Sequence, residues 1–364
     1  MTDHVQIAAA LDRAWKSGKQ VALATVVKVE GSAYRREGAK LAIEAGGCFT
    51  GLISSGCLEP EVAETAATVI DTNRPVRRRF DLRDDAVWGL GMGCGGTIEV
   101  FIEPAANTSG WHKWCEVLMR GEAAVRAIVH APLNSAMAGQ WILLTEEDEP
   151  VGRIENQRLR QAVTLISQDL LSSEKPRSLN RSLDDMEVFF DLNLPPPELL
   201  IFGAGGDAAP VVELAERLGF RTTIVDPRQA YANPERFPKA HCINVHPQEF
   251  SSKLRVPPRS YVVIMNHQLE RDQAALKLVL QSRTAYVGVL GPRSRFQKLV
   301  DGLAEEGLGL SPEQLARVHN PIGLDIGAEG PMEIAVSILA EVLAVRNGFA
   351  GAPLREREGG IHED

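Results

Sequence analysis

Two cysteines lie in loops whose composition suits a reactive thiol or a metal ligand. Cys57 follows a Ser-Ser-Gly run at 54–56 and directly precedes an expected helix. A helix N-terminus favours the thiolate form of a nearby cysteine, which makes it a nucleophile or a metal ligand. Cys94 lies between Gly93 and Gly95, so bare backbone can approach a bulky group there and offer N–H donors to an anion. Cys57 and Cys94 are therefore candidate site residues, and burial as small apolar side chains is the alternative for each.

The remaining cysteines, Cys48, Cys115 and Cys242, have ordinary strand or helix settings, and we expect them in the core. The five cysteines are odd in number and scattered, without a CxxC pair. Such a set is typical of a reducing cytoplasm rather than of a disulfide framework. We therefore expect a cytoplasmic protein with free thiols.

A short basic cluster lies in the loop between the first two expected strands. Arg35, Arg36 and Lys40 stand beside glycines there, and such cations bind phosphate or another anion. A solvated loop without a ligand is the alternative.

His267 and His319 each follow an expected strand and are candidates for proton transfer. The alternative for each is an ordinary solvated histidine without a function.

Residues 199–228 are predicted to form a strand, a glycine-rich turn, a helix and a second strand. Gly203, Gly205 and Ala208 occupy the three small-residue positions of the dinucleotide-binding fingerprint, which allow a tight turn, a close pyrophosphate and packing of helix on strand. The helix N-terminus offers N–H groups to phosphate. Asp226, at the tip of the second strand, is placed to accept hydrogen bonds from ribose hydroxyls, which favours NAD over NADP.

The function of this turn stays open between two alternatives. It can serve an NAD(P)-dependent oxidoreductase, with His267 or His319 as its acid or base, or it can belong to a scaffold whose site is empty. Asp207 lies inside the turn. Its carboxylate could repel phosphate or cap the helix instead.

The chain has 364 residues, a net charge of −9, 44% apolar residues and 24% charged residues. These values are typical of a globular protein long enough for two domains. The negative charge argues against nucleic acid as the main partner, because phosphate binding requires a basic face. No apolar run approaches the roughly 20 residues of a membrane span, and the acidic, amphipathic N-terminus does not resemble a signal peptide. A homodimer is compatible with the length and the acidic surface.

The expected elements divide the chain in two and give an α/β fold class. Residues 1–192 predict an α+β domain with a mixed sheet, two cysteine loops and a hairpin around Gly46 and Gly47. The proline run within 193–198 stiffens a linker. Residues 199–350 alternate strand and helix, which predicts a Rossmann-like, doubly wound parallel sheet, and 351–364 is expected to be a flexible tail.

Several stretches together resemble the XdhC/CoxI family, the accessory factors for xanthine dehydrogenase and related molybdenum hydroxylases. The matching pieces are ATVVKVEGSAYRREGAKLAI, GLISSGCLEPEV, GLGMGCGGTIEVFIEP, LLIFGAGGDAAPVVELAERLGF, YVGVLGPRSR and VHNPIGLDIGAEGPMEIAVSILAEVLAVR. They cover most of both halves, whereas residues from about 110 to 191 match poorly. Two cysteine loops ahead of a glycine turn and a terminal GLDIGA segment are more specific than a generic Rossmann pattern.

The resemblance implies a maturation factor, more a cofactor-binding chaperone than a stand-alone enzyme. Such a protein would bind molybdenum cofactor (molybdopterin), support its sulfuration with a cysteine desulfurase and insert it into an apo molybdenum hydroxylase. Cys57 and Cys94 occupy the family's two cysteine-loop positions and are implied ligands of molybdenum, for which thiolate is a suitable soft ligand. Arg35 and Arg36 would meet the phosphate of the pterin.

Overall fold

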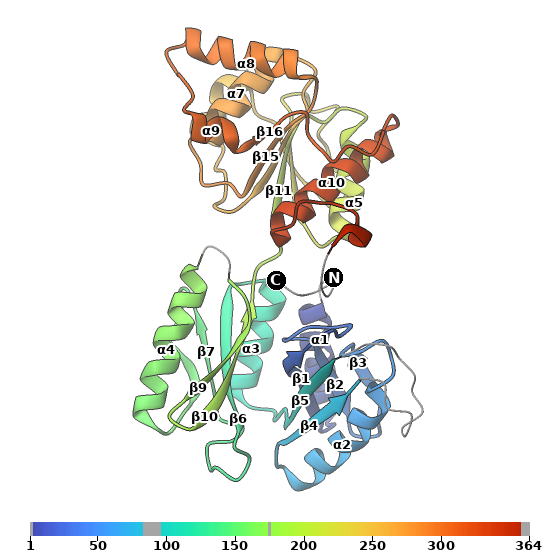
Figure 1. Ribbon diagram of the computed structural model, residues 1–364, viewed down its shortest axis with the longest axis vertical. Coiled ribbons are helices and arrows are strands. Elements are labelled where there is room, and N and C mark those ends of the chain that lie inside the picture. Colours follow the sequence, from blue (N-terminus) through green and yellow to red (C-terminus); the bar gives the residue numbers. More distant parts are fainter. Residues whose placement is uncertain (1–2, 83–95, 174–175, 358–364) are drawn as a thin grey trace. The chain divides into compact units, whose positions relative to one another are not determined.

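The computed structural model describes residues 3–82, 96–173 and 176–357. The chain forms two compact units that divide between Pro195 and Pro196, inside the proline run of 193–198 (Figure 1). Each unit has hydrophobic clusters of its own. In the described part of the chain, no helix has the length and apolar character needed to cross a membrane.

The first sheet of the N-terminal unit is antiparallel, with strand order β3-β2-β1-β5-β4. Its central strand is buried on both faces: Leu23 packs among residues of α1, and Ala24 packs among residues of α2. Successive side chains of a strand point to opposite faces, so one helix covers each face. The elements are α1 (Asp3–Lys16), β1 (Val21–Glu30), β2 (Lys40–Glu44), β3 (Phe49–Gly51), α2 (Glu59–Thr72), β4 (Val76–Asp81) and β5 (Thr97–Pro104).

The second sheet of this unit is also antiparallel, with strand order β8-β7-β6-β10-β9. Helix α4 covers one face, where Leu159 and Val163 pack among residues of β6 and β10. Helix α3 packs with α1. The elements are α3 (Ser109–Arg120), β6 (Ala124–Ala131), β7 (Trp141–Thr145), β8 (Val151–Arg153), α4 (Gln157–Ser172), β9 (Leu179–Leu183) and β10 (Met186–Asn193).

The α+β prediction for this unit is confirmed, with one correction. The strands pair antiparallel in two separate sheets, where the sequence predicts a mixed sheet. The hairpin around Gly46 and Gly47 is the β2–β3 pair, and both glycines have positive φ, +107° and +85°. The sequence pattern does not predict β8 and β9, because short strands with mostly partly exposed side chains give little periodic signal.

A buried ion pair joins the two sheets. Arg126 of β6 donates two hydrogen bonds to the carboxylate of Glu103 on β5, at 2.9 and 2.8 Å, and both side chains are almost fully buried. The rings of Trp111, Trp114 and Trp141 lie 4.2, 5.1 and 4.7 Å from the guanidinium carbon. The paired carboxylate and the aromatic faces compensate for the desolvation of the buried cation.

Lys40 forms a second buried ion pair between the same sheets. Its ammonium donates to the Asp191 carboxylate on β10 at 2.7 Å and to the Gly38 carbonyl at 2.8 Å. Both charged side chains are almost completely buried. The expectation that Lys40 belongs to an anion-binding cluster with Arg35 and Arg36 is therefore wrong, because its charge is used to hold the sheets together.

The C-terminal unit contains a six-stranded parallel sheet with strand order β13-β12-β11-β14-β15-β16. The order reverses between β11 and β14, and ligands of doubly wound sheets bind at the carboxyl ends of the strands at such a point. Ile201 packs with α5 and α10 on one face, whereas Phe202 packs with α6 and α7 on the other. The Rossmann-like prediction is confirmed.

The elements of this unit follow the alternating pattern that the sequence predicts. The strands are β11 (Glu198–Phe202), β12 (Arg221–Val225), β13 (His241–Ile243), β14 (Tyr261–Ile264), β15 (Tyr286–Val289) and β16 (Val318–His319). The α-helices are α5 (Ala208–Arg217), α6 (Phe250–Lys253), α7 (Leu269–Leu280), α8 (Arg293–Glu305), α9 (Pro312–Ala316) and α10 (Pro331–Asn347). Two short 3₁₀ turns are η1 (Pro247–Glu249) and η2 (Leu354–Glu356).

Arg126→Ala is expected to destabilise the N-terminal unit by about 3–5 kcal/mol, because it leaves the Glu103 carboxylate buried without its partner. Burial already raises the pKa of Glu103 above its ordinary value, even with Arg126 present. Urea unfolding of the full chain, followed by tryptophan fluorescence, measures the loss, since all five tryptophans precede residue 195.

Arg78→Ala is the matched control for this experiment. Arg78 pairs with Glu61, and both side chains are about half exposed. Exposed pairs contribute little, so we expect a loss below about 1 kcal/mol. Equal losses for the two variants would contradict the structural role of the buried pair.

Candidate functional site

Ser54 and Glu59 fix the backbone of the loop that carries Cys57. The hydroxyl oxygen of Ser54 accepts hydrogen bonds from the backbone N–H groups of Gly56, Cys57 and Leu58, at 3.2, 3.2 and 3.1 Å. The same hydroxyl donates to the Glu59 carboxylate, and both side chains are buried. Ser54 therefore fixes the three residues directly before α2, which begins at Glu59 and has no side-chain capping hydrogen bond at its N-cap, Leu58.

The Glu59 carboxylate also accepts hydrogen bonds from the backbone N–H groups of Ile53 and Ser54, at 3.0 and 2.8 Å. Burial acts to raise the pKa of Glu59, but these hydrogen bonds and the one from the Ser54 hydroxyl hold it below its ordinary value. An ionised carboxylate therefore organises the loop.

The Cys57 side chain is half-buried and lines a small pocket. Its Sγ lies 3.9 Å from the Ser55 hydroxyl oxygen. The pocket is lined by Ala33, Tyr34, Ile53, Ser54, Ser55, Cys57, Leu82 and Ile98. The loop that carries Arg35 and Arg36 and the loop that carries Cys57 thus both contribute to one pocket.

Arg35 and Arg36 directly follow Tyr34 of this pocket. Arg35 is half-buried, whereas Arg36 is exposed, with its Nε 3.7 Å from the Glu37 carboxylate. Surface pairs of this kind are weak, so a ligand anion can compete for Arg36. The anion-binding role of these arginines stays a prediction.

Cys94, Gly93 and Gly95 lie outside the described residues. The residues on either side of the segment 83–95 are described: Leu82 lines the Cys57 pocket, and its N–H donates to the Gly96 carbonyl at 2.8 Å. Leu82 and Gly96, the described residues on either side of this segment, are therefore hydrogen-bonded to each other beside the pocket of Cys57.

The other cysteines are free thiols in different surroundings. Cys48 is exposed, so its expected place in the core is wrong, because the tip of the β2–β3 hairpin stays in solvent. Burial raises the pKa of Cys115 to about 12 and that of Cys242 above its ordinary value, which disfavours their thiolates. Within the described residues, no cluster of three or more His, Cys, Asp or Glu side chains could hold a metal ion.

The glycine turn after β11 requires its small residues for close packing. Gly203 has a φ of +110°, and a Cβ there would lie 2.8 Å from the Met265 carbonyl oxygen. A Cβ on Gly205 would lie 3.1 Å from Nε2 of His267, so this histidine stands beside the turn. Ala208 is fully buried at the start of α5. The turn therefore lies directly against the end of β14.

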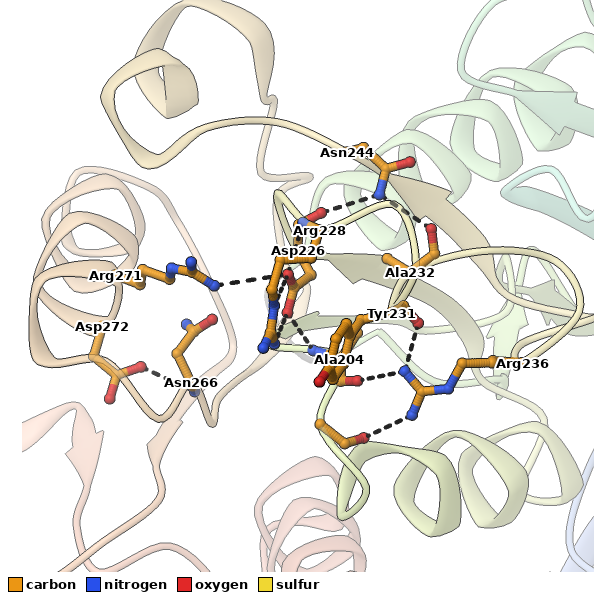
Figure 2. Close-up of polar contacts among 11 residues, drawn as sticks. Ala204, Asp226, Arg228, Tyr231, Ala232, Arg236, Asn244, Asn266, Arg271 and Asp272 are labelled. Carbon is orange, nitrogen blue, oxygen red and sulfur yellow. Dashed lines mark hydrogen bonds and ion pairs between the residues drawn. The ribbon is translucent and has the colours of Figure 1, made fainter.

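Asp226 is buried at the end of β12 and receives four hydrogen bonds. The backbone N–H of Ala204 donates to it at 3.0 Å, and Arg228 donates through its backbone N–H, Nε and Nη2 at 2.9, 2.9 and 2.7 Å (Figure 2). Arg271 lies 3.8 Å away. Burial acts to raise the pKa of Asp226, but these donors hold it below its ordinary value.

Two further residues, which the sequence pattern does not single out, brace this edge of the sheet. Arg236 donates to the carbonyl groups of Ala204 and Tyr231 at 2.9 and 2.8 Å (Figure 2). Asn244 donates to the carbonyl groups of Asp226 and Ala232 at 3.1 and 3.0 Å. Their sequence signal is weak, because an arginine or asparagine in a loop is ordinarily solvated.

The two candidate proton-transfer histidines have different settings. His267 is exposed beside the glycine turn. Nδ1 of His319 lies 3.0 Å from the Glu341 carboxylate, which also accepts hydrogen bonds from the Tyr286 hydroxyl and the Gly323 N–H. Glu341 therefore holds His319 in place. Their role in moving protons stays a prediction.

The strand order, the glycine turn after β11 and the acid after β12 define a Rossmann-type protein, here joined to an α+β unit with a structured cysteine loop. The chain belongs to the XdhC and CoxI family. The model described as "XdhC and CoxI family" matches residues 14–81, and the model described as "XdhC Rossmann domain" matches residues 199–342.

Relatives of similar length support this assignment. A probable xanthine dehydrogenase subunit of Bacillus subtilis is 31% identical over 93% of this chain and 97% of its own length. The molybdenum cofactor insertion chaperone PaoD of Escherichia coli is 24% identical over 94% of this chain and 89% of PaoD. A crystal structure of a xanthine dehydrogenase from Bacillus halodurans has a TM-score of 0.75 and 28% identity, covering 97% of this chain and 99% of that one.

Ser54→Ala is expected to destabilise the chain by about 1 kcal/mol, because three backbone N–H groups of the loop before α2 lose their acceptor. Ser55→Ala is the matched control, since its hydroxyl is exposed and contacts only the Cys57 sulfur among the described groups. Urea midpoints from tryptophan fluorescence compare the two. A midpoint for Ser54→Ala equal to that of Ser55→Ala would show that the hydrogen bonds of Ser54 do not stabilise the loop.

Asp226→Asn is expected to destabilise the C-terminal unit by about 2 kcal/mol at pH 7, because hydrogen bonds to a charged acceptor become neutral ones. The pKa of Asp226 lies below its ordinary value of 3.8, so the stabilisation is present above that pH and is lost as the pH falls through the lower folded-state pKa. Scanning calorimetry of the full chain between pH 3 and pH 7 should therefore show a difference that shrinks only below about pH 4. A difference that does not change with pH would rule out the ionised carboxylate as its source.

Proposed function

We propose that the chain is a maturation factor that carries molybdenum cofactor and inserts it into a molybdenum hydroxylase of the xanthine dehydrogenase type. Sulfuration of the cofactor by a cysteine desulfurase, while the carrier holds it, belongs to the same proposal. The names of two relatives of similar length support the role: one is a molybdenum cofactor insertion chaperone, and the other is a probable subunit of xanthine dehydrogenase. The four described cysteines are free thiols, which suits a reducing cytoplasm.

The observation that carries the proposal is the surroundings of Cys57. Its sulfur lines a pocket, and its backbone is fixed by Ser54 and Glu59. Thiolate is a soft ligand that suits molybdenum. Because the described residues hold no cluster of three or more His, Cys, Asp or Glu side chains that could bind a metal on its own, Cys57 would add one sulfur to a metal that arrives already coordinated.

Two further features, the arginines Arg35 and Arg36 and the thiol of Cys94, suit binding of the same cofactor. Arg35 and Arg36 stand in the loop whose Tyr34 lines the pocket, and a guanidinium pairs well with the phosphate of a pterin. Cys94 belongs to the segment between Leu82 and Gly96, which are hydrogen-bonded to each other. We infer that Cys94 is a second sulfur ligand from this segment.

The contacts of Asp226 weigh against the alternative, an NAD(P)-dependent oxidoreductase. In such an enzyme the acid accepts hydrogen bonds from ribose hydroxyls. Here its oxygens accept four N–H donors from Ala204 and Arg228. A ribose would have to displace donors that include a charged guanidinium.

Cys57→Ala is expected to lose most of the bound molybdenum cofactor, with at least a tenfold lower molybdenum content per chain. The experiment loads the full chain with the cofactor without oxygen, removes the excess, and measures molybdenum by elemental analysis and pterin by fluorescence. Cys48→Ala is the matched control, because Cys48 is an exposed free thiol of the same unit. Thermal midpoints of both variants check that they are folded.

An equal molybdenum content of Cys57→Ala and Cys48→Ala would show that Cys57 does not bind the cofactor. A loaded wild-type chain should also activate a purified apo-hydroxylase, and addition of a cysteine desulfurase with cysteine should raise that activity further. If the desulfurase does not change the activity of the hydroxylase, the sulfuration step is contradicted, whereas the proposed carrier role is not.

A further inference from the structure

Helix α10 has an apolar face on its solvent side. Met332 and Val336 are each 46% exposed, and Ala340 and Leu343 are half-buried. At about 100° per residue, these four side chains lie within about 80° of one another around the helix axis and form the α10 face. A surface helix ordinarily carries charged or polar side chains on the side away from the core. The α10 face is therefore suited to contact with another apolar surface.

The loop before α10 adds one more apolar side chain beside this face. The Leu324 N–H donates to the Ser337 carbonyl at 3.2 Å, and the Ser337 hydroxyl donates to the Leu324 carbonyl at 2.6 Å. The Glu329 N–H donates to the Glu333 carboxylate at 2.9 Å. Since Glu333 and Ser337 each directly follow a residue of the α10 face, the loop borders that face. Ile326 lies between these two attachments, is 52% exposed, and forms the α10 patch together with the α10 face.

The charges of this part of the chain are negative. Residues 320–345 contain four acidic residues and no lysine or arginine. Asp325, Glu329 and Glu333 are exposed, whereas the Glu341 carboxylate accepts hydrogen bonds within the unit. The α10 patch is therefore apolar with an acidic border.

The acidic border indicates which kind of molecule can cover the patch. A two-fold contact with a second copy of the chain would place the patch against itself, and the like charges would repel each other. Nucleic acids and anionic membranes are negatively charged as well. A protein surface with apolar side chains bordered by lysine or arginine complements the patch in both shape of contact and charge.

We propose that the α10 patch docks the apo molybdenum hydroxylase that receives the cofactor. This docking site rests on the proposed function, because a carrier has to hold its acceptor protein while the cofactor passes. Met332 and Val336 contact apolar side chains of the hydroxylase, and methionine adapts easily to such surfaces. Asp325 and Glu329 pair with lysine or arginine at the border. Charges at the border of an interface act mainly on the rate of association, which salt then lowers.

The test measures binding of the full, cofactor-loaded chain to purified apo-hydroxylase by biolayer interferometry. Val336→Glu should lower the affinity about tenfold or more, because it buries a charge in an apolar contact. Leu165→Glu is the matched control with unchanged affinity, because Leu165 is 67% exposed on α4 of the N-terminal unit. Asp325→Lys should lower the association rate and make it less dependent on salt.

Met332→Glu is the second variant, in case Val336→Glu does not fold. If both variants bind the hydroxylase as tightly as Leu165→Glu does, the proposal is overturned. Sedimentation velocity of wild type and Val336→Glu gives a second test, because a dimer lost only in Val336→Glu would assign the patch to a second copy. Loss of binding to a cysteine desulfurase, with hydroxylase binding intact, would also overturn the proposal.

The proposed function and the docking site can fail independently. Molybdenum content and hydroxylase binding of wild type test the carrier role. Variants that load the cofactor and still bind the hydroxylase with wild-type affinity contradict the docking site alone.

Discussion

The buried carboxylate of Glu59 is the contact on which the cysteine loop depends. It accepts hydrogen bonds from two backbone N–H groups and from the Ser54 hydroxyl, whose oxygen accepts further N–H groups from the residues before α2. One ionised group thereby fixes a turn that includes Gly56, a residue with much conformational freedom. Cys57 is held in one position before any ligand arrives, so less conformational entropy is lost on binding.

Asp226 has the corresponding role in the C-terminal unit, where its buried carboxylate fixes the glycine turn. It ties the glycine turn to Arg228 by accepting from the Ala204 N–H and from the guanidinium. In both units one acid, Glu59 or Asp226, is buried and surrounded by hydrogen-bond donors. A buried acid of this kind remains charged because its hydrogen bonds stabilise the carboxylate by more than burial destabilises it. The same hydrogen bonds make the loop around it rigid.

Local sequence patterns predict those features of the two sites that depend only on residues close together in the sequence. The positive φ of Gly203 and the helix start after Cys57 are of this kind. The pattern places Asp226 correctly at the end of a strand but does not show that Arg271, from a distant helix, approaches it. Lys40 is misassigned for the same reason, because its partner Asp191 lies 151 residues away. Pairings over such distances follow from how the sheets pack, which local periodicity does not encode.

The claim that Cys57 gives a sulfur ligand to molybdenum is tested most directly by X-ray absorption at the molybdenum edge of the cofactor-loaded chain. The account predicts that molybdenum in the loaded wild-type chain has one extra sulfur neighbour from Cys57, in addition to the one that we infer from Cys94. That extra sulfur should vanish in Cys57→Ala and persist in Cys48→Ala. An identical number of sulfur neighbours per bound molybdenum in wild type and Cys57→Ala would contradict it.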